Sequence, residues 1–398
     1  MDIADIFREH GDAYRASHVL TPEQSKVMRA IESCRTPARG GNVAVCNHCA
    51  RQELFYRSCG NRHCPKCQSL RQAKWVAERG ERVLPTHHFH VVFTLPEELR
   101  PLALCNPELL YKIMFSAASQ TLLVLGKDEQ RLGGVPGITA VLHSWTRSLS
   151  YHPHVHCIVT GGGLSLDDAR WIPTSKSFLF PVDVMRVLFR GKVLDAVSRA
   201  YKQGKLRLSG TCADLADPAC FERLKSKLYE KSWVVYSKPP FAGTDQVFQY
   251  LGRYTHRVGI SNPRILSADD DAVRFLTKNG KTCTLSPTEF IRRFLLHVLP
   301  SGFTKIRHFG LYAPANVRTR LRTARNLLDP STCSSSSNPA AAVVTGMVTD
   351  ATDANEPPPP SSWQALFLTI TGIDLSRCKA CGVGQMLYYQ MPPGTGPP

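Results

Sequence analysis

The chain has 398 residues, with 49 Lys or Arg against 32 Asp or Glu, which gives a formal net charge of +17. Its 43% hydrophobic content suffices for two or three globular domains, and its charge indicates a polyanionic partner such as nucleic acid. No uninterrupted apolar stretch approaches the ~20 residues of a membrane span, and the polar start MDIADIFREH does not resemble a signal peptide. We therefore expect a cytoplasmic protein, in which the 14 cysteines are not expected to form a disulfide framework.

Two closely spaced cysteine pairs mark the first 82 residues. Cys46-Asn-His-Cys49 and Cys64-Pro-Lys-Cys67 are separated by fourteen residues. This spacing is typical of structural zinc sites, because each tight turn brings two thiolates to one side of a tetrahedral ion. We expect these four cysteines to bind one structural Zn²⁺ and to leave no open position for chemistry. Further candidates, either as alternate ligands or as parts of a second site, are Cys34, Cys59 and His63.

Basic and aromatic residues are mixed in the same part of the chain. Residues 51–82 carry eight Lys or Arg and three Asp or Glu, interleaved with Phe55, Tyr56 and Trp75. This mixture suits phosphate contacts combined with base stacking. A solvated basic face is the alternative interpretation. The stretch ends in an expected helix over residues 69–84.

Hydrophobic periodicity predicts a larger domain of strands and helices downstream. In chain order, the expected elements are a strand in 87–96, a helix over 107–125, a strand over 150–159, one or two helices within 180–206, a strand in 231–240, a helix from Asp245 to Gly259, a hairpin about Asn279-Gly280 within 272–286, and a helix in 287–300. The Ser- and Pro-rich residues 329–362 predict a flexible linker.

The tail beyond the linker contains one further cysteine pair, Cys378 and Cys381. Two thiolates are half of a tetrahedral zinc site. Either the second pair is missing, or Cys333 or another chain completes the ligand set. The sequence alone assigns no metal there.

The strand over residues 150–159, SYHPHVHCIV, places three histidines at every second position. Because side chains alternate along a strand, His152, His154 and His156 share one face, and Val155 and Cys157 share the opposite, apolar face. Neutral imidazole is the commonest metal ligand, so three imidazoles on one face indicate a metal site. A half-buried strand with solvent-facing histidines is the alternative.

The helix that begins at Asp245 carries Tyr250 and Tyr254 one turn apart on the same face, with Arg253 and Arg257 alongside. Core packing is the ordinary role of such a tyrosine pair. Beside a divalent ion held by imidazoles, the phenol oxygens become candidate nucleophiles for a phosphodiester. The two arginines are then candidate DNA-binding residues that neutralise the charge on the phosphate.

Taken together, the motifs resemble the two-tyrosine HUH endonucleases and, more narrowly, the rolling-circle transposases of the insertion-sequence ninety-one family. The resemblance covers residues from about 20 to 330, and it is carried by His154-Val155-His156, Tyr250-x-x-x-Tyr254 and the strings SCGNRHCPKCQ, SLSYHPHVHCIVTGGGLS and YLGRYTHRVGISNPRI. It implies an α+β fold with a ferredoxin-like antiparallel sheet and flanking helices. The histidine strand is expected at the centre of this sheet, after a small zinc-ribbon-like module.

The resemblance also implies a chemistry. His154 and His156 are expected to bind a catalytic Mg²⁺ or Mn²⁺, and Tyr250 and Tyr254 to attack single-stranded DNA at transposon ends. The products are 5′-phosphotyrosine links and free 3′-hydroxyls, which later rejoin strands at target DNA in the bacterial cytoplasm. The family has a third metal ligand that the sequence does not identify, and its candidates are His90, His152, Gln249 and His256.

We expect a zinc- and DNA-binding module over residues 1–82, a catalytic domain over 83–328, the linker over 329–362 and a short tail over 363–398. Two other functions remain open. A plasmid or phage rolling-circle replication initiator or relaxase uses the same chemistry in another context. A zinc-dependent nucleic-acid-binding regulator has no catalysis, and its histidines and tyrosines are structural.

Overall fold

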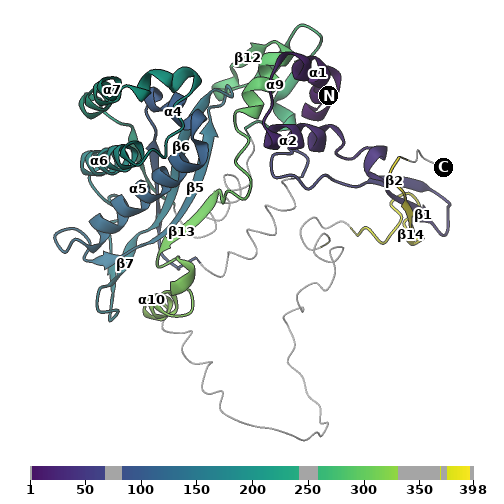
Figure 1. Ribbon diagram of the computed structural model, residues 1–398. Helices are drawn as coiled ribbons and strands as arrows, with labels where there is room; N and C mark the ends of the chain where they lie inside the picture. The colour runs from purple at the N-terminus through teal and green to yellow at the C-terminus, as the bar shows by residue number, and fades with distance from the viewer. Residues whose placement is uncertain (1, 68–82, 242–258, 330–367, 369–373, 395–398) are drawn as a thin grey trace, which may run out of the picture. The chain divides into compact units, whose positions relative to one another are not determined.

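The computed structural model describes residues 2–67, 83–241, 259–329, 368 and 374–394 (Figure 1). The chain divides into two compact units. The first consists of Met1–Glu32 and Asn61–Pro330, and the second of Ser33–Gly60 and Ser331–Pro398. The second unit thus combines two segments from distant parts of the sequence.

A five-stranded sheet forms the centre of the first unit, in the order β13-β5-β6-β3-β9. All neighbouring strands are antiparallel. The strands are β3 (His88–Thr94), β5 (Gly137–Trp145), β6 (Tyr151–Thr160), β9 (Val235–Phe241) and β13 (Ile306–Gly310). The histidine strand β6 is the central strand, and the mixed helix and antiparallel-sheet architecture confirms the expected α+β class.

The apolar core lies between this sheet and a layer of helices (Figure 1). The helices are α4 (Arg100–Cys105), α5 (Pro107–Lys127), α6 (Val182–Lys202) and α7 (Pro218–Glu230). Val155 and Cys157 of β6 are fully buried in this core, as the alternation in the sequence predicts. Phe93 of β3 contacts Phe189 of α6, with 4.9 Å between ring centroids.

Helix α5 is long and apolar enough, by composition, to cross a membrane, although 67% of its most apolar window is buried inside the fold. Its Tyr111 hydroxyl lies 2.8 Å from the hydroxyl of Tyr151 at the start of β6, and both side chains are buried. The helix is therefore the core helix that supports the histidine strand.

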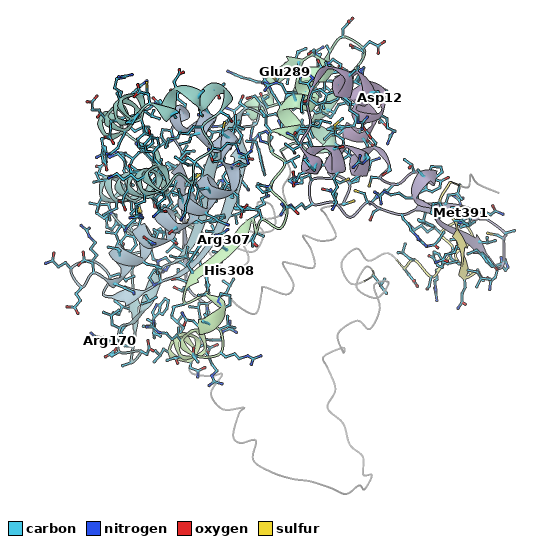
Figure 2. The ribbon with its side chains drawn as sticks, in the orientation of Figure 1. Asp12, Arg170, Glu289, Arg307, His308 and Met391 are labelled. Atoms are coloured by element: carbon cyan, nitrogen blue, oxygen red, sulfur yellow. The ribbon has the colours of Figure 1, made fainter. Side chains whose placement is uncertain are left out.

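At one edge of the sheet, β13 contributes side chains to both faces (Figure 2). The Arg307 guanidinium lies 4.7 Å from the centroid of the Phe115 ring on α5. Its neighbour His308 turns to the opposite face, where its Nδ1 lies 3.1 Å from Oγ1 of Thr139. This alternation again separates an apolar helical side from a polar side.

The remaining elements of the first unit flank the sheet. They are α1 (Ile3–Ser17), α2 (Pro22–Glu32), β4 (Gly134–Val135), β7 (Gly162–Ser165), β8 (Trp171–Pro173), β10 (Ile265–Ala268), β11 (Val273–Leu276), β12 (Thr282–Leu285), α9 (Pro287–Leu295) and α10 (Arg320–Leu328). The expected hairpin is confirmed, because β11 and β12 pair across a turn in which Asn279 and Gly280 both adopt positive φ. Helices α1 and α9 pack through Phe7 and Phe294, whose ring centroids are 5.2 Å apart.

The second unit contains a three-stranded antiparallel sheet in the order β14-β1-β2. Its strands are β1 (Gly41–Cys46), β2 (Gln52–Tyr56) and β14 (Met386–Met391). The pairing of β1 with β14 runs from Gly41 opposite Met391 to Cys46 opposite Met386. A strand from the end of the sequence therefore belongs to the same sheet as two strands from its beginning.

Two expected helices lie outside the described residues. These are the helix over residues 69–84, most of which falls in 68–82, and the tyrosine helix, which falls in 242–258. The expected linker also lies almost wholly outside the described residues. The four predicted domain ranges stay a prediction.

Candidate functional site

The polar face of the central sheet brings three histidines together. His154 and His156 extend from β6 on the side opposite the buried Val155 and Cys157. His143 of β5 is paired in register with His154. One ring nitrogen from each of the three histidines lies within 4.8 Å of the others, a set that fits the imidazole ligands of one divalent ion.

The three rings meet edge to face rather than in a stack. The ring centroids of His143 and His156 are 4.5 Å apart, and those of His154 and His156 are 4.8 Å apart. The indole of Trp145 lies against His143 with 4.7 Å between centroids and an interplanar angle of 22°. The rings are thus held by neighbours on two strands, which favours a preorganised ligand set.

The hydrogen bonds of His154 define which nitrogen is available to a metal. Its Nδ1 lies 2.6 Å from the carbonyl oxygen of His152. Because a carbonyl only accepts, Nδ1 carries the proton and Nε2 keeps its lone pair. Burial lowers the pKa of His154 to about 4, so the ring is neutral near pH 7 and suited to ligate a cation.

A second layer of residues supports this group. Nε2 of His90 on β3 lies 2.8 Å from Nδ1 of His156, and burial lowers the pKa of His90 to about 3. The guanidinium of Arg100 donates to Nδ1 of His152 at 2.8 Å. His90 and His152, two of the four third-ligand candidates, therefore contact neighbouring groups and lie outside the three-histidine set.

The histidine that completes the set, His143, was not among the sequence candidates. Its signal in the sequence is weak, because GITAVLHSW is an apolar strand with a single histidine near its end. Its role depends on the register of the β5–β6 pair, which a lone strand pattern does not fix. The other two third-ligand candidates, Gln249 and His256, lie outside the described residues.

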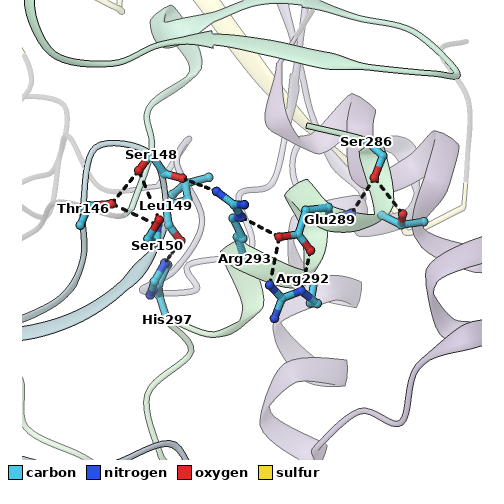
Figure 3. Close-up of polar contacts among 10 residues, drawn as sticks. Thr146, Ser148, Leu149, Ser150, Ser286, Glu289, Arg292, Arg293 and His297 are labelled. Atoms are coloured by element: carbon cyan, nitrogen blue, oxygen red, sulfur yellow. Dashed lines mark hydrogen bonds and ion pairs between the residues drawn. The ribbon is translucent and has the colours of Figure 1, made fainter. Parts of the chain in front are cut away.

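The turn that joins β5 to β6 is anchored to α9 and to the residues that follow this helix (Figure 3). Arg293 donates to the carbonyl oxygen of Ser148 at 3.2 Å, and Nε2 of His297 lies 3.1 Å from the carbonyl oxygen of Leu149. Glu289 accepts hydrogen bonds from Arg292 at 2.6 Å and from Arg293 at 2.7 Å. This network fixes the turn between the strands that carry the three histidines.

A separate cluster of four cysteines lies in the second unit. Cys46, Cys49, Cys378 and Cys381 place their Sγ atoms within 4.8 Å of one another. The grouping of Cys46 and Cys49 with Cys64 and Cys67 on one ion is therefore corrected, because the C-terminal pair supplies the other two thiols. The sequence contains a signal for this grouping, because the N-terminal pair and the C-terminal pair are each half of a zinc site.

The structure also shows the surroundings of the other cysteines, and of the histidine, that the sequence suggested as zinc ligands. In the second unit, the backbone N–H of Cys59 points to Sγ of Cys34 at 3.4 Å. In the first unit, Cys64 is buried and its carbonyl accepts from the N–H of Cys67 at 3.1 Å. Nε2 of His63 accepts from the backbone N–H of Leu299 at 3.3 Å. Zinc binding by Cys64 and Cys67 stays a prediction.

The predicted nucleophiles Tyr250 and Tyr254, and the predicted DNA-binding residues Arg253 and Arg257, lie outside the described residues. Their roles rest on the sequence. The described histidines and cysteines supply candidate metal ligands of two kinds, imidazole nitrogens and cysteine thiolates.

Known proteins resemble this chain, one of them over its whole length. A family model described as "Transposase zinc-binding domain" matches residues 6–95, and one described as "Putative transposase" matches residues 137–320. A Sinorhizobium fredii protein described as "Putative transposase y4qJ" is 42% identical over 405 residues, which is 100% of this chain and 97% of that protein. The "Transposase for insertion sequence element IS801" of Pseudomonas savastanoi pv. phaseolicola is 28% identical over 289 residues, 71% of this chain and 68% of that protein. No solved structure matches the chain.

Proposed function

The chain belongs to the transposases of the insertion-sequence ninety-one family, with a zinc-binding domain near its N-terminus, and from this premise we propose its mechanism. It nicks and rejoins single-stranded DNA at the ends of its element through 5′-phosphotyrosine intermediates. The observation that supports the proposal is the convergence of His143, His154 and His156 on the polar face of the sheet.

His143, His154 and His156 are proposed to hold one divalent cation, Mn²⁺ or Mg²⁺, beside the scissile phosphate. When bound, this ion polarises the phosphodiester and stabilises negative charge on its oxygens. The neutral state of His154 at physiological pH leaves its Nε2 lone pair ready for the ion. The hydrogen bond between His90 and His156 orients the latter ring.

One of the two tyrosines, Tyr250 or Tyr254, is proposed to attack the first phosphate. The other tyrosine then performs the second, linked transfer. In each attack a bond forms between the phenol oxygen and phosphorus, and the bond from phosphorus to the 3′-oxygen breaks. The phenol loses its proton, and the departing 3′-oxygen gains one as it becomes a hydroxyl. Arg253 and Arg257 neutralise the charged phosphate during transfer. The bond energy stays in the phosphotyrosine link, so rejoining needs no ATP.

The partners proposed are single-stranded DNA at the two element ends and target DNA, in the bacterial cytoplasm at the nucleoid. The net charge of +17 supports a nucleic-acid partner. A replication initiator or relaxase shares the chemistry, but both matched relatives are described as transposases. A cleavage assay distinguishes these enzymes from a DNA-binding regulator that has no catalytic activity.

The test uses a single-stranded oligonucleotide that carries an element end, incubated with the full-length protein and Mn²⁺. Covalent protein–DNA adducts are resolved on a denaturing gel. The double variant Tyr250→Phe with Tyr254→Phe keeps both rings and removes only the attacking oxygens, so we expect a folded protein without adducts. If the tyrosines only packed in a core, phenylalanine would cost about 0.5–1.5 kcal/mol for each lost hydrogen bond and leave cleavage intact.

Each single tyrosine variant is expected to form an adduct and to fail in the paired transfers. The double variant His154→Ala with His156→Ala is expected to lose cleavage while retaining most DNA binding, because phosphate contacts come from Arg and Lys elsewhere. A covalent adduct from the folded double phenylalanine variant would show that other residues are the nucleophiles. Undiminished nicking by the double alanine variant would show that His154 and His156 do not hold a cation that cleavage requires.

A further inference from the structure

The four-cysteine cluster of the second unit joins the two ends of the sequence. Sγ of Cys46 lies 3.7 Å from Sγ of Cys381, and Sγ of Cys49 lies 3.7 Å from Sγ of Cys378, across 335 and 329 residues of chain. We propose that Cys46, Cys49, Cys378 and Cys381 hold one structural Zn²⁺, so that the C-terminal tail completes a zinc module begun near the N-terminus.

The sulfur separations match this ion. Four thiolates at the usual Zn–S distance of about 2.3 Å form a tetrahedron whose S···S edge is about 3.8 Å. The two observed separations of 3.7 Å agree with that edge. A disulfide would bring two sulfurs to about 2.05 Å, and the four cysteines are free thiols. The geometry therefore favours a shared cation over cross-linking.

The backbone around each pair has donors directed at sulfur. The N–H groups of His48 and Cys49 point to Sγ of Cys46, both at 3.4 Å. In the C-terminal pair, the N–H of Gly384 points to Sγ of Cys381 at 3.3 Å. Such N–H groups stabilise a thiolate over a thiol, and thiolate is the form that binds zinc. The two pairs thus have similar local surroundings.

The C-terminal pair is held in position by backbone contacts to the N-terminal pair. The N–H of Asn47 donates to the carbonyl of Gln385 at 3.1 Å, and the N–H of Gln385 donates to Oδ1 of Asn47 at 2.9 Å. Strand β14 then pairs antiparallel with β1 over six residue pairs. A Cβ on Gly384 would lie 2.4 Å from Sγ of Cys46, so only glycine allows this approach.

The matched zinc-binding family model ends at residue 95 and therefore excludes Cys378 and Cys381. If the module is built from both ends, its metal binding and its folding depend on residues 374–394. Metal-binding free energy then stabilises the docking of β14 on β1. Chelation is expected to release the C-terminal segment while the sheet of the first unit stays folded.

The first test measures the number of zinc ions per chain in the purified full-length protein by inductively coupled plasma mass spectrometry. Cys378→Ser with Cys381→Ser is expected to lose one ion per chain, and Cys46→Ser with Cys49→Ser to lose the same ion. The quadruple variant is expected to lose no more than either pair, because all four residues serve one site. The matched control, Cys220→Ser with Cys283→Ser, keeps the full zinc content.

Two results would overturn the proposal. One is an unchanged zinc content in the variant lacking Cys378 and Cys381. The other is a quadruple variant that loses two ions, which would indicate two independent sites. Mixing the two double variants is expected to restore no zinc, since each chain lacks half of its own site. Restored zinc would place the site between two copies of the chain.

A second measurement uses the wild-type protein and does not depend on variants that fold. Cysteine alkylation is followed by peptide mass spectrometry before and after treatment with a chelator. Cys46, Cys49, Cys378 and Cys381 are expected to be protected together and to become reactive together, and Cys283 to react alike in both states. Labelling of Cys378 and Cys381 at the rate of Cys283 in the zinc-loaded protein would contradict a shared ion.

Discussion

Nε2 of His90 lies 2.8 Å from Nδ1 of His156, and this contact connects β3 to the candidate metal ligands on β6. Both rings are buried. A hydrogen bond to the outer nitrogen of a ligating imidazole fixes its orientation and tautomer, and the loss of such a partner typically weakens metal binding about 10- to 100-fold. His90 is thus expected to act as a positioning residue.

His90→Phe keeps a ring of similar size and removes the hydrogen bond. The Mn²⁺ concentration that gives half-maximal cleavage is expected to rise by about 10- to 100-fold, with cleavage restored at saturating Mn²⁺. His90→Gln, whose amide retains polar atoms, should recover part of the affinity. An unchanged Mn²⁺ dependence in His90→Phe would exclude the positioning role.

His143 and His152 offer a direct comparison of two histidines near the same site. His143 belongs to the group of three convergent nitrogens, whereas Nδ1 of His152 accepts a hydrogen bond from Arg100. His143→Ala is expected to abolish detectable Mn²⁺ binding by calorimetry and to stop cleavage. His152→Ala should retain both to within about tenfold, as expected of a residue that only supports a ligand strand. The reverse order of effects would make His152 the third ligand.

The central strand was predictable because its pattern is strong. Val155 and Cys157 are fully buried, as the alternation with His154 and His156 requires. His143 was not predictable, because its approach to His154 depends on pairing between two strands and on the turn that joins them.

The zinc ligands could also be predicted only in part from the sequence. The pair Cys46 and Cys49 is recognisable as half of a zinc site from its spacing. Its closest described partners come from the far end of the sequence, at Cys378 and Cys381, and spacing carries no information about contacts over more than 300 residues. Sequence patterns indicate which residues can bind a metal, whereas the fold decides which of them meet.

Glu289 is expected to make stability depend on pH. Hydrogen bonds from Arg292 and Arg293 lower the pKa of Glu289 from an ordinary 4.5 to about 2. The folded state therefore binds fewer protons than the unfolded state in this interval. The stabilising contribution is fully present above pH 4.5 and is lost as the pH falls towards about 2.

Urea unfolding of the wild type and of Glu289→Gln tests this dependence. The wild type is expected to be more stable at pH 7, and the difference between the two proteins to shrink as the pH falls from 4.5 towards 2. Glu222→Gln is the control, because Glu222 pairs with Lys225 on the exposed surface of the same helix, a type of contact that contributes about 0–1 kcal/mol. A difference between wild type and Glu289→Gln that does not vary with pH would contradict the prediction.

The chemistry of the three ligands predicts a preference between the two metals proposed for catalysis. His143, His154 and His156 offer nitrogen atoms only, whereas Mg²⁺ prefers carboxylate, carbonyl and water oxygens. Mn²⁺ accepts imidazole more readily, so half-maximal cleavage is expected at a lower concentration of Mn²⁺ than of Mg²⁺. The measurement is a metal titration of adduct formation on the same oligonucleotide at constant ionic strength.

The control for this titration is His143→Asp, which replaces one imidazole by a carboxylate at the same position. An oxygen ligand favours Mg²⁺ relative to Mn²⁺, so the ratio of the two half-maximal concentrations should move towards Mg²⁺ in this variant. A shift that follows the ligand type ties the preference to residue 143, because ionic strength and DNA contacts are unchanged. If wild type and variant showed the same ratio, His143 would lie outside the coordination sphere, and the metal would be held by His154 and His156 with other ligands.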